Sequence, residues 1–177
     1  GFRQAVLTNG EMAAFYNGIA FLGAFAMVPI AKRIGAGPLH ALALVAGGIS
    51  MLLLPEVTDK AMLFAVILGV GLAWGSIMGN PYVILSNSIP EERVGVYMGI
   101  FNMMIVLPML FFAFIMSSLN LGVINIGLGV YENVLGNDPR NVLRVSGVCM
   151  FVAAFAVLWV REGWRKVADG EASAAAE

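Results

Sequence analysis

The sequence predicts an all-α integral membrane protein with about five transmembrane helices. Of its 177 residues, 60% are apolar and only 12% are charged, whereas a typical soluble domain has about 25% charged residues. Five apolar runs are each long enough for a helix to cross a bilayer, which takes roughly 20 residues. We therefore expect lipid to be the solvent around most of the chain.

The five predicted spans follow one another through short polar connections. Backbone groups cannot be left unpaired in hydrocarbon, so each run is expected to form a continuous helix. The runs are Met12 to Ala31, Leu39 to Pro55, Ala61 to Leu85, Val94 to Leu119, and Leu143 to Val160. The stretch NLGVINIGLGVY at 120–131 is apolar but short, and reads as a helix extension or an interfacial piece.

These spans divide the chain into three parts. Residues 1–11 precede the first span, residues 12–160 form the transmembrane part, and residues 161–177 form a tail. The end of the tail, DGEASAAAE, is polar and small, which predicts disorder there.

Basic residues in the connections predict the orientation of the chain, because cytoplasmic loops are enriched in Lys and Arg. Lys32, Arg33, Arg93, Arg161, Arg165 and Lys166 share one side, and Arg3, Lys60, Arg140 and Arg144 share the other. The excess predicts a multi-pass protein with a cytoplasmic C-terminus and an extracytoplasmic segment at 1–11; the plasma (inner) membrane itself is implied only by the family resemblance described below. A chain that starts outside without a signal peptide is expected to be a piece of a longer protein.

Several functional classes do not fit this composition. The net charge is −1 and the ten basic residues lie singly or in pairs, so nucleic acid is not an expected partner. One cysteine, Cys149, and one histidine, His40, offer neither a disulfide nor a metal cluster, and no cofactor is predicted. Because no acid–base pair or nucleophile–base set lies within the spans, we do not expect an enzyme.

Small residues in the third predicted span indicate close helix packing. Gly71, Gly75 and Gly79 are spaced at i, i+4 and i+8, which places them on one helical face. In lipid, helices associate through such close backbone approach rather than through the hydrophobic effect. Plain packing explains these glycines without any further function.

Neutral polar side chains are the remaining candidates for solute contact, because no charged residue lies in the middle of a span. They are Tyr16, Asn17, Ser76, Asn80 and Asn102. Amides and hydroxyls can pair with the hydroxyls of an uncharged solute, and Trp74 offers a flat face that can stack on a sugar ring. The alternative for each Asn is a hydrogen bond to an adjacent helix backbone. Together they favour a polar, neutral ligand over a charged one.

The charged turn between the third and fourth spans predicts a helix start. Ser88 followed by Glu91 matches a capping box, with Pro90 inside the first helical turn. Glu91 and Glu92 would lie at the positive end of the helix dipole. Capping accounts for these charges, so they receive no catalytic role.

The stretch around this turn carries a family resemblance. The sequence NPYVILSNSIPEERVGVYMGIFNMMIVLP at 80–108 resembles the tenth-to-eleventh helix segment of major facilitator superfamily sugar transporters. The branch is that of the sucrose transporters and glycoside-pentoside-hexuronide cation symporters. The upstream stretch AFYNGIAFLGAFAMVPIAKRIGAGPLHALALVAGG at 14–48 is similar to the eighth helix, basic turn and ninth helix of that branch.

Three features depart from the pattern of this branch. Asn87 stands where the branch often has Asp, which puts a charge-mediated gating contact in question. Met109 stands where Gln is common, which weakens any transfer of sugar specificity. The turn at 31–38 keeps Lys32 and Arg33 but lacks the full Asp-Arg-x-Gly-Arg pattern.

The resemblance implies a fold and a function. The five spans would be helices 8–12 of a twelve-helix major facilitator fold, partnered by a missing N-terminal half. The whole would carry a glucoside or disaccharide together with a proton or another cation by alternating access. On this mapping the substrate contacts are Asn17, Trp74, Asn80 and Asn102, with Tyr16 and Tyr82 as weaker candidates.

Two alternatives stay open. A major facilitator exporter of drugs or amphipathic metabolites would need an apolar cavity. A membrane scaffold or assembly subunit predicts that Asn17, Trp74 and Asn102 face neighbouring helices instead of a shared cavity. The sequence leaves open the particular sugar, the coupling ion, the direction of transport and the oligomeric state.

Overall fold

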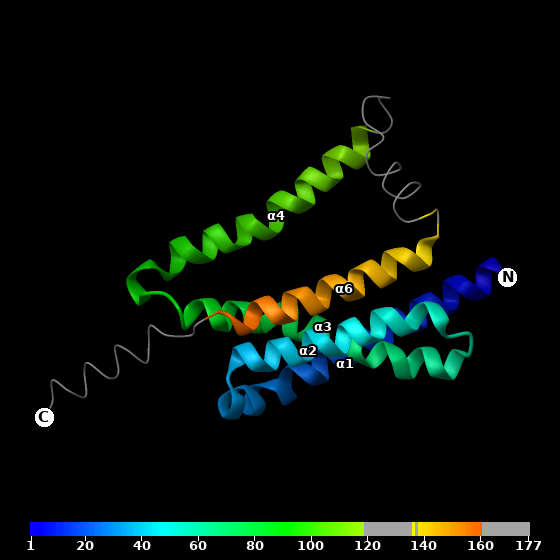
Figure 1. Ribbon diagram of the computed structural model, residues 1–177, viewed down its shortest axis with the longest axis horizontal. Coiled ribbons are helices and arrows are strands. Elements are labelled where there is room, and N and C mark those ends of the chain that lie inside the picture. The colour runs from blue at the N-terminus through cyan, green and yellow to red at the C-terminus, as the bar shows by residue number, and fades with distance from the viewer. Residues whose placement is uncertain (119–135, 137, 161–177) are drawn as a thin grey trace, which may run out of the picture. The chain divides into compact units, whose positions relative to one another are not determined.

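The chain folds into long α-helices (Figure 1). The structure is a computed structural model that describes residues 1–118, 136 and 138–160. For residues 112–118 it describes the backbone alone. Five of the helices are long and apolar enough to cross a membrane, which confirms the predicted all-helical architecture with about five candidate spans. The described part contains no strand. The helices are α1 (Phe2–Ile34), α2 (Ala36–Leu53), α3 (Lys60–Ser86), α4 (Val94–Ser118) and α6 (Pro139–Leu158), with 3-10 turns at Leu54–Glu56 and Glu91–Arg93.

The largest difference from the predicted spans lies at the N-terminus. α1 begins at Phe2, so most of residues 1–11 continue the helix of the first span. Its 33 residues correspond to a length of about 50 Å, more than the roughly 30 Å of a bilayer core. A helix can run past its apolar stretch because its backbone is paired internally in water as well as in lipid. The segments at 120–131 and 161–177 lie outside the described residues.

Local sequence fixes where the helices begin and end. Gly35 is the single non-helical residue between α1 and α2, and it has a φ of 91°, a conformation that favours glycine. Asp59 caps α3, since its carboxylate accepts a hydrogen bond of 2.9 Å from the Met62 backbone N–H. Asp138 similarly accepts from the Arg140 N–H at 2.9 Å at the start of α6.

The predicted capping box at the start of the fourth span is wrong. Pro90 is the N-cap of the 3-10 turn Glu91–Arg93 that precedes α4, and no side chain caps that turn. The Ser88 hydroxyl instead donates to the Ile84 carbonyl at 2.7 Å. The last carbonyls of a helix lack intrahelical partners, and Ser88 satisfies one at the end of α3.

The chain divides into two units, and each is described by itself. Gly1–Ser88 together with the chain from Leu143 onward forms the first unit, and Ile89–Val142 forms the second. In the first unit α3 packs along both α1 and α2 (Figure 1). The second unit contains α4, whose helix includes Pro108.

Glycines make the helix contacts of the first unit close. A Cβ at Gly71 would lie 2.8 Å from the Tyr16 carbonyl oxygen, and one at Gly75 would lie 2.7 Å from that of Ala20. α3 therefore approaches the α1 backbone at both predicted glycines. α2 meets α6 in the same way, since a Cβ at Gly147 would lie 2.9 Å from the Gly48 carbonyl oxygen.

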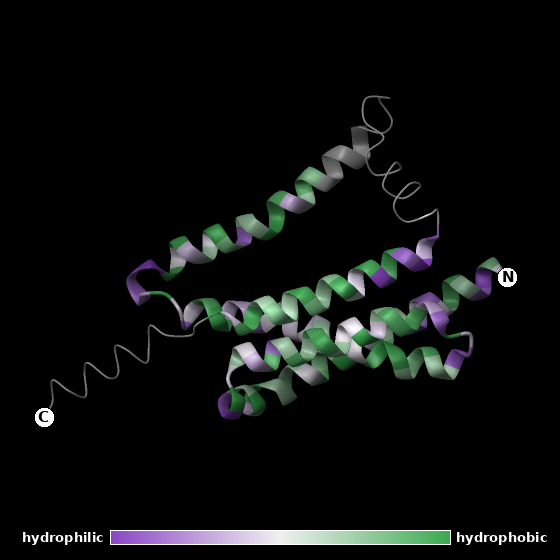
Figure 2. Cartoon of the chain, in the orientation of Figure 1, coloured by the Kyte–Doolittle hydropathy of each residue, from purple (hydrophilic) through white to green (hydrophobic). Residues whose placement is uncertain are grey.

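Large apolar side chains remain on the outside of these helices, and Figure 2 shows hydrophobic residues along the helices with hydrophilic residues concentrated near their ends. Phe21, Leu22 and Phe25 on α1 are each about two-thirds exposed. A soluble protein rarely exposes apolar surface on this scale. Such a surface is compatible with insertion of these helices into a membrane.

Candidate functional site

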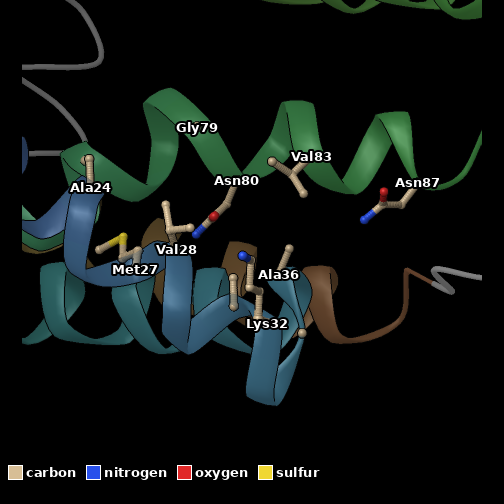
Figure 3. A pocket seen from close by; sticks show the side chains of 12 residues that line it. Ala24, Met27, Val28, Lys32, Ala36, Gly79, Asn80, Val83 and Asn87 are labelled. Atoms are coloured by element: carbon tan, nitrogen blue, oxygen red, sulfur yellow. The ribbon is translucent and has the colours of Figure 1, made fainter.

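A cavity of about 450 Å³ lies between α1 and α3, beside the beginning of α2 (Figure 3). Its volume falls within the range of ligand-binding pockets, roughly 300–1,000 Å³. Its lining residues are Ala24, Met27, Val28, Ala31, Lys32, Gly35, Ala36, Gly75, Gly79, Asn80, Val83 and Asn87. Small residues at the helix contact leave this space open: a Cβ at Gly79 would meet no atom within 4 Å.

The polar groups of the cavity are unevenly distributed. Lys32 and Asn87 lie at the C-terminal ends of α1 and α3. Asn80 lies two turns further into α3, about 10 Å along the helix axis. Figure 3 shows its side chain directed from α3 toward α1. A solute entering at the helix ends would therefore meet charge first, then an amide, then apolar wall.

Behind the cavity wall, Asn80 belongs to a buried chain of polar side chains. Its amide nitrogen donates to the Ser76 hydroxyl at 2.7 Å, and the same hydroxyl lies 2.7 Å from His40 Nδ1 on α2. Ser76 is 1% exposed, His40 6% and Asn80 8%. Buried polar groups need such partners, because leaving them unpaired in a low-dielectric interior is costly.

Two simple features of the sequence bring these three hydrogen-bonded side chains together. Ser76 and Asn80 are four residues apart on α3, so they lie one above the other on the same helical face. His40 lies in the second turn of α2, which begins directly after Gly35. The close packing of α2 on α3 then brings the imidazole to Ser76.

Of the residues predicted to contact substrate, Asn80 lines the cavity, whereas Asn17 and Trp74 do not. The exposed Asn17 side chain donates to the Ala13 carbonyl of its own helix at 2.8 Å. Trp74 is 42% exposed. A substrate contact for Asn17 and Trp74 stays a prediction.

The remaining predicted contacts are Tyr16, Tyr82 and Asn102. Tyr16 on α1 is half-buried, and its carbonyl oxygen faces Gly71. Tyr82 is half-buried on α3, one residue beyond Pro81. Asn102 is exposed on α4 in the second unit. Their role in substrate binding also stays a prediction.

The structure adds Lys32 and Asn87, which line the cavity and which the sequence did not single out as contacts. It also adds His40, which with Ser76 supports Asn80 from behind. Ser76 was among the polar candidates of the sequence, but it lies behind the cavity wall. The spacing of Ser76 and Asn80 was visible in the sequence. The pairing with His40 was not, because it depends on how α2 packs against α3.

Two other cavities are weaker candidates. One, of about 470 Å³, lies among Gly1, Gln4, Thr58 and their neighbours, and is open to solvent. The other, of about 440 Å³, lies between α2 and α6 and is lined by apolar residues and proline. Neither contains a buried polar side chain.

The α1–α3 cavity is suited to binding a solute without covalent chemistry, since it offers an amide, an ammonium group and an apolar wall. Within the described ranges, no group of three or more His, Cys, Asp and Glu side chains lies close enough together to hold a metal. Comparisons with protein-family models, curated proteins and solved structures found no match. A functional assignment therefore rests on the residues of this chain.

Proposed function

We propose that this chain is part of a secondary transporter that carries an uncharged sugar, a glucoside or disaccharide, together with protons. The observation that carries the proposal is the buried amide of Asn80, which lines a cavity of about 450 Å³ within a bundle of membrane-spanning helices. Binding sites for small molecules combine a largely apolar wall with a few fixed polar groups. An amide can both donate to and accept from a sugar hydroxyl.

The resemblance of residues 80–108 and 14–48 to sugar transporters of the major facilitator superfamily supports the same proposal. In that arrangement the five helices are helices 8–12 of twelve, and an N-terminal half completes the cavity. The membrane is the plasma (inner) membrane, with the C-terminus in the cytoplasm.

The proposed mechanism is alternating access, in which two halves rock around a central site. The cavity lies beside Lys32 in the last turn of α1 and Gly35 between α1 and α2, and this end is expected on the cytoplasmic side. Gly71 and Gly75 lock α3 against α1, so these two helices would move as one body. The solute would exchange with the cytoplasm beside Lys32.

Uptake of radiolabelled sucrose or methyl glucoside by membrane vesicles that contain the complete transporter tests the proposal. We expect accumulation that depends on an imposed proton gradient and is abolished by a protonophore.

Asn80→Leu should lower uptake at least ten-fold, because it removes the amide from the cavity while keeping a similar volume. Ser50→Ala, at a buried hydroxyl on α2 away from the cavity, should leave uptake unchanged. Uptake that is indifferent to Asn80→Leu and to the gradient would contradict the proposal.

The apolar wall of the cavity favours a second candidate, export of an amphipathic compound. Nine of the twelve lining residues carry no polar side-chain group, and Lys32 lies at the mouth. An amphipathic solute would place its polar end near Lys32 and its apolar body deeper along α1. Asn80→Leu separates the two candidates: sugar uptake should fall, whereas extrusion of a lipophilic dye by an exporter should persist.

A further inference from the structure

The linked side chains of Asn80, Ser76 and His40 can be hydrogen-bonded in one of two directions. In the structure the Asn80 amide nitrogen donates to Ser76 Oγ. The Ser76 hydroxyl then has one hydrogen to donate, and in the described part of the chain its second contact is His40 Nδ1. If that hydrogen is donated to Nδ1, the imidazole proton lies on Nε2, and Ser76 can only accept from Asn80.

The other arrangement has the imidazole proton on His40 Nδ1, which then donates to Ser76 Oγ. The hydrogen of Ser76 is no longer committed to His40, so Ser76 can either accept from the amide nitrogen of Asn80, because Oγ has two lone pairs, or donate to the amide oxygen. Only a proton on Nε2, with Nδ1 accepting from Ser76, commits the amide nitrogen of Asn80 to Ser76.

The amide nitrogen of Asn80 is bonded to Ser76, and its amide oxygen is the atom that remains for a solute to contact. Asn80 Oδ1 makes no hydrogen bond to another described residue, although the side chain is more than nine-tenths buried. Every fully enclosed side-chain nitrogen or oxygen in the described part has a partner. Oδ1 is therefore reached from the cavity that Asn80 lines.

We infer that His40 and Ser76 are positioning residues that hold the Asn80 carbonyl oxygen toward the cavity as a hydrogen-bond acceptor. The site then selects solutes that present a hydroxyl donor at this point, and disfavours those that present only an acceptor. This inference rests on the proposed function for the identity of the solute. The direction of the hydrogen-bond chain can be measured without it.

The first experiment uses the fact that His40 is the only histidine. Nitrogen NMR of the chain in lipid nanodiscs, labelled with ¹⁵N-histidine, yields one imidazole whose two nitrogens distinguish the tautomers. We expect a neutral ring with the proton on Nε2 and with Nδ1 accepting a hydrogen bond. In Ser76→Ala the Nδ1 resonance should move to the position of a nitrogen without a bonded donor.

A matched control for this experiment is Ser50→Ala, which removes an equally buried hydroxyl outside the chain of bonds. Its His40 resonances should stay where they are in the unchanged protein. A proton on Nδ1 would overturn the inference, because Nδ1–H would donate to Ser76 and His40 would no longer determine which end of the Asn80 amide Ser76 holds. An Nδ1 resonance that is unaffected by Ser76→Ala would overturn it as well.

The second experiment measures transport kinetics in the complete transporter. With sucrose as the probe, Ser76→Ala should raise KM about two- to ten-fold, the range expected for loss of one oriented hydrogen bond, with the maximal rate and the membrane level unchanged. Ser50→Ala should change neither constant. An unchanged KM in Ser76→Ala would contradict the positioning role. Absence of any sugar transport would instead contradict the proposed function. In that case the NMR experiment alone would decide the inference.

Discussion

At the scale of single residues, three glycines on one face of α3 have different surroundings. Gly71 and Gly75 lie against carbonyl oxygens of α1, whereas Gly79 faces the cavity. Their spacing predicted a common face, and two of the three make the expected close contact. The third keeps space open, so one sequence pattern serves both packing and the cavity.

This difference predicts different costs for the same substitution. In Gly71→Ala the new methyl group would lie 2.8 Å from the Tyr16 carbonyl oxygen, so α1 must shift, at a cost of about 1–3 kcal/mol. Gly79→Ala meets no atom within 4 Å and should be neutral or stabilising, because Ala is the better helix former. Thermal unfolding of the two variants in nanodiscs compares them. Equal melting temperatures would contradict the α1–α3 contact.

At the scale of elements, one residue joins α1 to α2 and determines how the cavity is lined at that end. Gly35 has a φ of 91° and a ψ of 154°, a combination that is open almost only to glycine. Because no other residue separates the helices, α2 reverses direction directly beside the end of α1. Gly35 and Ala36 therefore line the cavity together with Lys32.

We expect Gly35→Ala to strain this turn by about 1–3 kcal/mol. The expected results are a lower melting temperature and weaker solute binding, since the cavity wall includes the turn. Gly18→Ala is the control, because Gly18 is also on α1 and a Cβ there meets nothing within 4 Å. If both variants melt at the same temperature, the turn does not require glycine.

Ion pairs join helix ends on the side opposite this turn. Lys60 lies 2.5 Å from Glu11, and Arg144 lies 2.5 Å from Glu56. All four side chains are about half exposed, so each pair is worth at most about 1 kcal/mol. The pairs join α1 to the start of α3 and the 3-10 turn after α2 to α6, while the glycine contacts provide the close packing.

At the scale of the whole molecule, orientation in the membrane determines which compartment the cavity faces. The excess of basic residues predicts that the α1–α2 turn is cytoplasmic and that the connection between α2 and α3 is outside. A cavity beside Lys32 would then exchange solute with the cytoplasm.

Thiol labelling tests this orientation. In the complete protein with Cys149→Ala, a membrane-impermeant maleimide should label Thr58→Cys in intact cells. Arg33→Cys should react only after the cells are opened. Both positions are exposed at helix ends, so accessibility to the reagent is matched. The reverse pattern would invert the predicted topology.

The sequence by itself determined the all-helical architecture and the approximate position of each of the five candidate spans, because a helix that could cross a bilayer requires a long apolar run with an internally paired backbone. It also indicated Asn80 as a candidate contact and Gly71 and Gly75 as packing residues. It misjudged the role of Ser88, since either neighbouring helix could use that hydroxyl.

Only the tertiary structure decided which polar side chains meet. His40 and Ser76 are 36 positions apart, and nothing in the periodicity of either helix pairs them. Lipid solvates an apolar side chain as well as a neighbouring helix does, so hydropathy cannot tell which face of a span points inward. Close contacts at glycines make that choice, and they bring His40 to Ser76 and leave Asn80 at the cavity.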